Sequence, residues 1–284
     1  MPLTCLGIYR EPEYSPGRHT SNDALILRLV GQALERLGVS IKLVSLEEAR
    51  TCWKDAELIV SMCQGPEAVA ELMEWKKQGA RILNDPTASR KTYRDQLCEL
   101  LRAQNLAFPR SDFLRTDSSM DLVPFKSYFE KGSAWLKRHD VHAMQAGDVL
   151  RLMHWEELAP ALKTFAERGL RQAVLQENRQ GDEVKFYAIR GGTFFWPYYP
   201  KDCYGYPFDE TKLQALAEAA AEALGVQIYG GDAIISPEGN ITLIDLNDFP
   251  SFAPCRGAAA HAIAQFIKDT HHALQNNRKA TAAR

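Results

Sequence analysis

Short apolar runs alternate with amphipathic stretches over residues 1–84. Four of the runs have the composition of strands: LTCLGIY, IKLVS, ELIVSMC and ARILN. Two stretches between them carry apolar residues at helical spacing and end in glycine, SNDALILRLVGQALERLG and PEAVAELMEWKKQG, and LEEAR adds a short helix. Because strands that alternate with helices favour a parallel sheet covered on both faces, residues 1–84 are expected to form an N-terminal domain.

Residues 85–192 have a mixed pattern. The segment RKTYRDQLCELLRAQN is typical of one helix that leads away from the first sheet. Three short strands, SAWLKRH, AVLQEN and VKFYAIR, then accompany the helix HWEELAPALKTFAERG. This range predicts a linker helix and a small α+β lid subdomain.

Residues 193–284 predict a second α+β subdomain. The aromatic-rich segment TFFWPYYPKDCYGYPF is interpreted as a loop that covers the core, and an alanine-rich helix follows it, DETKLQALAEAAAEALG. A turn of Pro237–Asn240 joins the strands VQIYGGDAIIS and NITLIDLND, and the last helix is AAAHAIAQFIKDTHHALQ. The chain therefore combines α/β and α+β parts.

Composition narrows the class of protein. The 284 residues are 45% hydrophobic and 25% charged, as in ordinary globular proteins, and no apolar run is long enough to span a membrane. The net charge of −2 gives no general attraction to nucleic acid or anionic lipid. Six scattered cysteines without ligand spacing, and an N-terminus without a secretory signal, lead us to expect a cytoplasmic protein with reduced thiols.

Candidate chemistry lies in the last two predicted strands. Asp245 and Asn247 alternate, so they share a face, and Asp232 on the preceding strand can lie opposite them. Acidic residues at a hairpin are usually solvated, but these stand within apolar strands, where a buried carboxylate needs a partner. Two carboxylates and an amide oxygen form an all-oxygen site that suits Mg²⁺.

The segment YGGDAIISPEGNITLIDLNDFPSF resembles the metal-binding end of the ATP-grasp superfamily. The stretch that starts at Asn84-Asp85-Pro86 is similar to the superfamily's bridge between its first and second domains. The resemblance extends over roughly residues 80–270, with several motifs in the same order, and points to RimK-like and glutathione-synthetase-like ligases. It implies an ATP-grasp fold that binds ATP and Mg²⁺, with an N-terminal parallel-sheet domain and two subdomains that enclose ATP.

The resemblance also assigns roles to individual residues. Lys137 corresponds to the strand lysine that reaches the nucleotide phosphates, although an isolated strand lysine would more often extend to water. The hinge Gln176-Glu177-Asn178 would hold adenine and ribose, and Lys185 would face the phosphates and the acceptor as a catalytic residue. Asp232, Asp245 and Asn247 would hold the metal.

Three features depart from the common pattern. The superfamily often has a glycine-rich flap after the first lysine, whereas RHDVHAMQAGDV has a single glycine, Gly147. Asp245 stands where most ligases have Glu, and the Asp-x-Asn-x-Phe-Pro motif resembles the inositol polyphosphate kinase branch instead. Lys185-Phe-Tyr and His142-Ala-Met also resemble that branch.

The acceptor side has weaker candidates. Arg256 precedes the last helix, where a guanidinium and a helix N-terminus together can hold a carboxylate or phosphate, so it is the second catalytic candidate. Arg10, Arg18 and His19, in the loop after the first strand, are candidates from the opposite side.

Three hypotheses follow for an acidic small-molecule substrate. The first is a ligase that phosphorylates a carboxylate and lets an amine attack the acyl phosphate; it leads because most members of the superfamily are ligases and because no excess of basic residues suggests a polyphosphate. The second is a small-molecule kinase, and the third is a catalytically silent ATP-binding protein. The resemblance also makes a homodimer an expectation to test.

Overall fold

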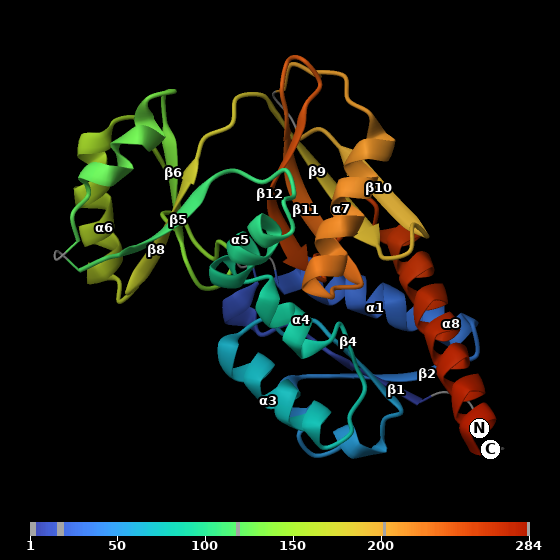
Figure 1. Cartoon of the computed structure of the whole chain (residues 1–284). Coiled ribbons are helices and arrows are strands. Elements are labelled where there is room, and N and C mark those ends of the chain that lie inside the picture. The colour runs from blue at the N-terminus through green and yellow to red at the C-terminus, as the bar shows by residue number, and fades with distance from the viewer. Residues whose placement is uncertain (1–3, 16–19, 118–119, 201–202, 283–284) are drawn as a thin grey trace.

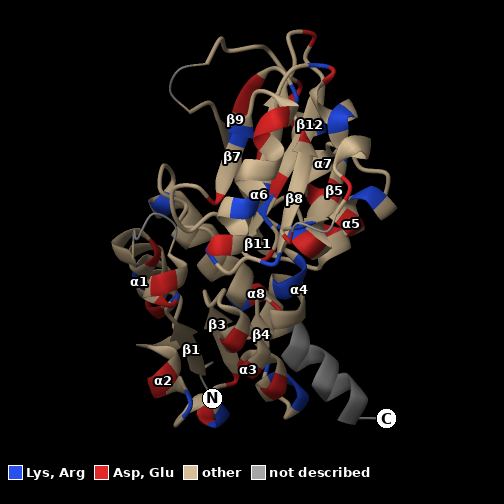
Figure 2. Ribbon diagram, turned by 90° about the vertical axis from the view of Figure 1, so that its left-hand side faces the viewer, with Lys and Arg blue, Asp and Glu red and all other residues tan. Residues whose placement is uncertain are grey.

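Three four-stranded sheets organise the chain in the computed structural model, which describes residues 4–15, 20–117, 120–200 and 203–282 (Figure 1). Basic and acidic segments are interspersed around all three sheets (Figure 2), in keeping with the small net charge. None of the described helices combines the length and apolar character that crossing a bilayer requires. All six cysteines are free thiols.

The first sheet is parallel, as predicted, and has the strand order β2-β1-β3-β4. Its strands are β1 (Thr4–Ile8), β2 (Ser40–Val44), β3 (Leu58–Ser61) and β4 (Ile82–Leu83). One face packs on α1 (Thr20–Arg36) and on α8 (Arg256–Ala282), while the other packs near α3 (Pro66–Lys77). Short helical segments complete this part: η1 (Pro12–Tyr14), α2 (Leu46–Ala49) and η3 (Trp53–Asp55). Apolar side chains lie on both faces of the central strands β1 and β3, which is why these two strands are mainly apolar, whereas β2 at the sheet edge contains Ser40 and Lys42.

The linker that we predicted as one helix consists of two, α4 (Pro86–Lys91) and α5 (Arg94–Ala103). Tyr93 lies between them with φ −67° and ψ 141°, which is extended backbone. Its ring is buried, and its hydroxyl donates to the carbonyl of Gln64 at 2.5 Å. This contact with a residue far away in the sequence holds the break, which local helix propensity does not reveal.

The second sheet is antiparallel, with the order β5-β8-β6-β7. Its strands are β5 (Ser111–Arg115), β6 (Ala134–Arg138), β7 (Val149–Leu152) and β8 (Gln172–Glu177). A separate apolar core lies between this sheet, η4 (Val123–Phe129) and α6 (Leu158–Glu167), which η5 (Trp155–Glu157) precedes. This part stands at one side of the molecule in Figure 1, as expected for a lid.

The third sheet, β10-β9-β11-β12, corrects two expectations. β9 (Asp182–Ile189), placed in the lid from sequence, pairs with β11 (Ile228–Ile235) of this sheet. The aromatic segment predicted as a loop contains β10 (Phe194–Tyr198), whose Pro197 is tolerated because the strand lies at the sheet edge. The remaining elements are β12 (Ile241–Asp248) and the covering helix α7 (Glu210–Leu224).

Asn84 joins the first sheet to the third. The carboxamide is 2% exposed and lies directly after β4. Its nitrogen donates to the carbonyl of Ile228 at 2.7 Å and to the carboxylate of Asp248. Its oxygen accepts from the amides of Gln227 and Ile228, each at 2.9 Å. One side chain therefore satisfies backbone groups at the start of β11 and a buried carboxyl at the end of β12.

We predict that Asn84→Ala lowers the free energy of unfolding by about 3 kcal/mol, because it leaves several buried polar groups without partners. Gln78→Ala, which removes an exposed carboxamide from the end of α3, should change stability by less than about 0.5 kcal/mol. Urea denaturation followed by circular dichroism measures both. Equal stability of the two variants would contradict the joining role of Asn84.

Candidate functional site

Three charged side chains stand side by side across the third sheet. In the strand register Asp232 of β11 lies opposite Asp245 of β12 on one side and opposite Lys185 of β9 on the other. The register shifts directly after Asp232, where the ladder has an irregularity. The predicted placement of Asp232 opposite Asp245 is therefore correct, and Lys185 joins them through a strand that the sequence had placed elsewhere.

Each carboxylate of this row has a cationic partner. The Lys185 ammonium lies 3.0 Å from Asp232 and 2.6 Å from Glu183. The Arg94 guanidinium, at the start of α5, lies 3.3 Å from Asp245. Carboxylates at neighbouring positions repel each other, so these cations make the arrangement tolerable.

The surroundings shift the pKa values of the two carboxyls in opposite directions. Burial raises the pKa of Asp232 to about 6, with Lys185 opposing the shift and Asp245 and Glu183 adding to it. Burial also raises the pKa of Asp245, but the charges of Arg94 and Lys137 outweigh it and hold the pKa below its usual value. Asp245 therefore stays ionised, whereas Asp232 is the carboxyl that takes up a proton as the pH falls towards about 6.

The row fits a magnesium ion by the chemistry of its donors. Asp232, Asp245 and Asn247 all line one cavity and offer carboxylate and amide oxygens, which Mg²⁺ prefers. Among the described residues no group of three or more His, Cys, Asp or Glu side chains could hold a metal, and this row has two carboxylates and one amide.

A larger cavity, of about 790 Å³, opens between the second and third sheets. Four of the five residues predicted to bind the nucleotide line it: Lys137, Gln176, Glu177 and Asn178. The fifth, Lys185, lines a separate cavity instead. Lys137 is 7% exposed, and burial lowers the pKa of its ammonium while Asp245 opposes the change. The structure therefore brings the predicted lysine and the predicted hinge to one cavity.

Hydrogen bonds and an ion pair fix the hinge residues. Gln176 donates to the hydroxyl of Ser111 at 3.1 Å, and the Asn178 carboxamide oxygen accepts from the Trp135 indole at 2.8 Å. Glu177 pairs with Arg179 at 3.1 Å. Tyr204 and Tyr206 of the aromatic segment also line this cavity, with ring centroids 5.4 Å apart. That segment thus contributes to a cavity wall as well as covering the core.

A smaller cavity, of about 380 Å³, lies between the first and third sheets. Its lining includes Arg10, Asn22, Gln64, His142, Lys185 and Asn247. Four residues line both cavities: Arg94, Ala143, Asp232 and Asp245. The two carboxylates therefore stand where the cavities meet.

Arg10 and Arg256, the acceptor candidates, differ in how far other contacts engage them. The Arg10 guanidinium is buried and donates to the carbonyls of Met62 and Phe249 at 3.2 and 2.7 Å, and it lies 3.3 Å from Asp23. Arg256 donates to the Asn22 carboxamide oxygen at 2.6 Å, and its buried Nε has no hydrogen-bond partner in the described part of the chain. We therefore interpret Arg10 as part of the cavity wall, and the catalytic role of Arg256 stays a prediction. Arg18 and His19 lie outside the described residues.

Arg94 is a site residue that the sequence analysis missed. It occupies the first position of α5, where the helix dipole disfavours a cation, and it is nonetheless 5% exposed. Its ion pair with Asp245 explains why it is tolerated there. A basic residue at a helix start was the signal in the sequence, although only the fold reveals its partner.

Comparisons with known proteins identify the fold. A scan against models of protein families finds no match, and a search of curated proteins finds none either. Solved structures do match. D-alanine–D-alanine ligase from Bacillus anthracis, complexed with ATP, has a TM-score of 0.73 at 11% identity over 97% of this chain and 99% of that one.

Two further structures agree. D-alanyl-alanine synthetase A from Vibrio cholerae has a TM-score of 0.69 at 14% identity, over 95% of this chain and 98% of its own. A RimK domain ATP-grasp protein from Sphaerobacter thermophilus has a TM-score of 0.67 at 16% identity, over 92% and 98%. At these identities the likeness establishes the fold alone. The parallel first sheet, the two antiparallel sheets and these matches together show that the chain has the ATP-grasp fold.

Proposed function

We propose that this protein is a magnesium-ATP-dependent ligase that activates a carboxylate as an acyl phosphate and joins it to an amine. The observation that carries the proposal is the meeting of two cavities at Asp232 and Asp245. The larger cavity is the place for ATP and the smaller one is the place for the acceptor. Because the carboxylate row lines both cavities, it is the place where a phosphoryl group would pass from one to the other.

The charges of the smaller cavity favour an acceptor with a single carboxylate over a polyphosphate. Arg10 is bonded to two carbonyls and to Asp23, and Lys185 is paired with two carboxylates. Asp248, also in the lining, adds a buried acid. A multiply charged acceptor requires several unpaired cations, which this lining offers poorly. This supports the ligase over the inositol polyphosphate kinase-like alternative.

In the proposed reaction the protein positions the reactants and neutralises charge. Lys137 meets the phosphates of ATP from the larger cavity, and Lys185 meets the transferring group from the smaller one. Asp232, Asp245 and Asn247 would hold Mg²⁺, which would supply positive charge to neutralise the phosphates. The acceptor's carboxylate oxygen bonds to the γ-phosphorus as the bond to ADP breaks. The amine then attacks the acyl carbon, and phosphate leaves.

The hydroxylamine assay tests this proposal. Protein, magnesium-ATP and pooled small carboxylic acids are incubated with and without hydroxylamine, which converts an acyl phosphate into a hydroxamate. Hydroxamate formation together with ADP release supports the ligase. ADP release with a stable, hydroxylamine-resistant phosphorylated product indicates the kinase instead, and ATP binding without any turnover indicates the silent binding protein. Sedimentation of the same sample tests the expected homodimer.

Lys137→Ala and Asp245→Asn are each expected to lower turnover by about a hundredfold or more with the fold intact. The first removes charge at the transferring phosphoryl group, and the second removes a hard metal ligand. Lys163→Ala, an exposed lysine of α6 in the same subdomain as Lys137, is the control for loss of a positive charge. ADP release measured at saturating ATP compares the variants. Wild-type turnover in either site variant would refute the assignment of that residue.

A pH dependence follows from the raised pKa of Asp232, about 6. A metal ligand must be deprotonated, so below about pH 6 the ion must displace a proton from this carboxyl. The affinity for Mg²⁺ in the presence of a non-hydrolysable ATP analogue should fall by up to about tenfold per pH unit there, and level off above. Titration calorimetry between about pH 5 and 8 measures it.

Asp232→Asn is the control for this pH dependence. The variant keeps whatever dependence comes from the phosphates of the nucleotide, and it loses the share that comes from the carboxyl. Identical pH profiles in wild type and variant would exclude Asp232 as a ligand that exchanges a proton for the metal.

A further inference from the structure

The segment 139–148, between β6 and β7, covers the place where the two cavities meet. Ala143 lines both cavities, and His142 lines the smaller one. This is the position at which the resemblance led us to expect a glycine-rich flap, and the segment contains one glycine, Gly147. The structure shows what holds this glycine-poor segment in place.

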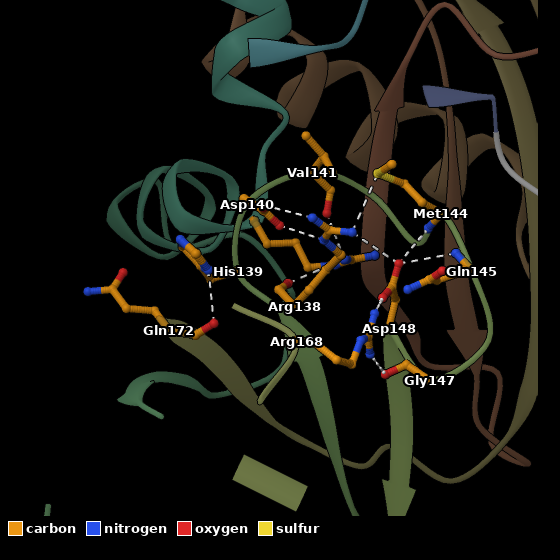
Figure 3. A network of polar contacts seen from close by, with 11 residues as sticks. Arg138, His139, Asp140, Val141, Met144, Gln145, Gly147, Asp148, Arg168 and Gln172 are labelled. Atoms are coloured by element: carbon orange, nitrogen blue, oxygen red, sulfur yellow. Dashed lines mark hydrogen bonds and ion pairs between the residues drawn. The ribbon is translucent and has the colours of Figure 1, made fainter. Parts of the chain in front are cut away.

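Asp148 gathers the segment around its carboxylate (Figure 3). The side chain is fully buried, and one of its oxygens accepts from the amides of Met144 and Gln145 at 2.9 and 3.1 Å. Arg138 donates to the same oxygen at 3.2 Å, and Arg168 pairs with the other oxygen. Arg168 also donates to the carbonyl of Gly147 at 2.8 Å. The carboxylate thus closes the turn and joins it to β6 and to the end of α6.

The carboxylate is charged in this setting. Burial raises the pKa of Asp148, but the hydrogen bonds from Met144, Arg168, Gln145 and Arg138 outweigh burial and hold the pKa below its usual value. Hydrogen bonds to an ionised acceptor are stronger than those between neutral groups. The turn is therefore closed by charge-assisted bonds.

Residues from two other parts of the chain fasten the segment from outside its own subdomain. Arg94 of the linker donates from its backbone to the Asp140 carbonyl at 3.1 Å and from its side chain to the Val141 carbonyl at 3.0 Å. The His142 imidazole Nε2 lies 3.0 Å from the carbonyl of Tyr14, the last residue of η1, which follows β1. The segment is held by its own subdomain, by the linker and by the N-terminal domain.

We propose that segment 139–148 is a preformed cover over the transferring phosphoryl group and that Asp148 is the positioning residue that keeps it formed before ATP binds. This inference rests on the proposed function. It adds that segment 139–148 is already ordered when no nucleotide is bound. A cover ordered in advance spares nucleotide binding the entropy cost of closing a loop. Disturbing Asp148 should therefore weaken the binding of ATP more than it slows the subsequent chemistry.

Arg168→Gln and Lys163→Gln form a matched pair for the test. Both replace a cation by a carboxamide, Arg168 at the end of α6 and Lys163 within it. Of the two, only Arg168 contacts Asp148, and Lys163 is an exposed residue 4.0 Å from Glu167. Hydrogen exchange measured by mass spectrometry follows the amides of 139–148 with and without Mg²⁺ and a non-hydrolysable ATP analogue. Steady-state kinetics supplies KM for ATP and kcat, and Asp148→Asn serves as a second variant.

In the free wild-type protein the amides of Met144 and Gln145 should already be protected, and the nucleotide analogue should change their exchange little. Arg168→Gln should speed their exchange by about tenfold, leave β6 and β8 protected, and regain protection with the analogue. KM for ATP should rise several-fold with kcat nearly unchanged, Arg168→Lys should restore part of the loss, and Lys163→Gln should match wild type.

Two results would overturn the proposal. Fast exchange of 139–148 in the free wild-type protein, with protection only after nucleotide is added, would make the segment a flap that closes on binding. If hydrogen exchange in Arg168→Gln and Asp148→Asn became equally faster in β6, β8 and α6, Asp148 would be a residue of general stability and not a positioning residue of the cover. Failure of the wild type to bind ATP would refute the proposed function separately, because the exchange of the free protein does not depend on it.

Discussion

Two carboxylates at facing positions of one hairpin are the constraint on which the structure depends. Asp232 and Asp245 repel each other unless cations stand beside them, and each cation comes from a different part of the chain. Lys185 comes from the third sheet, Arg94 from the linker helix and Lys137 from the second sheet. The electrostatics of the row therefore require the lid, the linker and the third sheet to be assembled around it. Asp232, Asp245 and Arg94 line both cavities, at the place where the two meet.

The parts are held together by polar side chains that bind backbone groups. Asn84 satisfies the start of β11 from the end of β4, and Arg10 reaches from the end of β1 to the carbonyl of Phe249 after β12. Both are buried, so water cannot replace the lost partners if either is removed. Such contacts hold the first sheet against the third. They thereby also position the residues of both parts that line the smaller cavity.

Local patterns in the sequence were enough to predict much of this architecture. Apolar runs between helical stretches predicted the parallel first sheet, and alternation along the last hairpin placed Asp245 and Asn247 on one face with Asp232 opposite. The order of motifs predicted the cavity that holds Lys137 and the hinge at Gln176. These inferences succeed because each depends on neighbours in the sequence or on a recurring order of elements.

The failures all involve long-range pairing. The sequence of β9 does not say which sheet it joins, because its alternation suits either one, and β10 is a strand only because β9 lies beside it. The break before α5 depends on Tyr93 reaching Gln64, and Arg94 becomes a site residue only through Asp245. No flanking residue encodes such partners.

The packing of α8 has a consequence for synthesis. The core on one face of the first sheet contains Ile26, Leu27 and Val30 of α1 together with Ile263 and Ile267 of α8. Ribosomes add roughly 5–20 residues per second, so the early half of this core waits many seconds for its last helix to emerge. Until then the nascent chain carries an uncovered apolar face, which is the kind of surface that chaperones bind. The N-terminal domain comes first in the sequence, but it is among the last parts of the molecule to be completed.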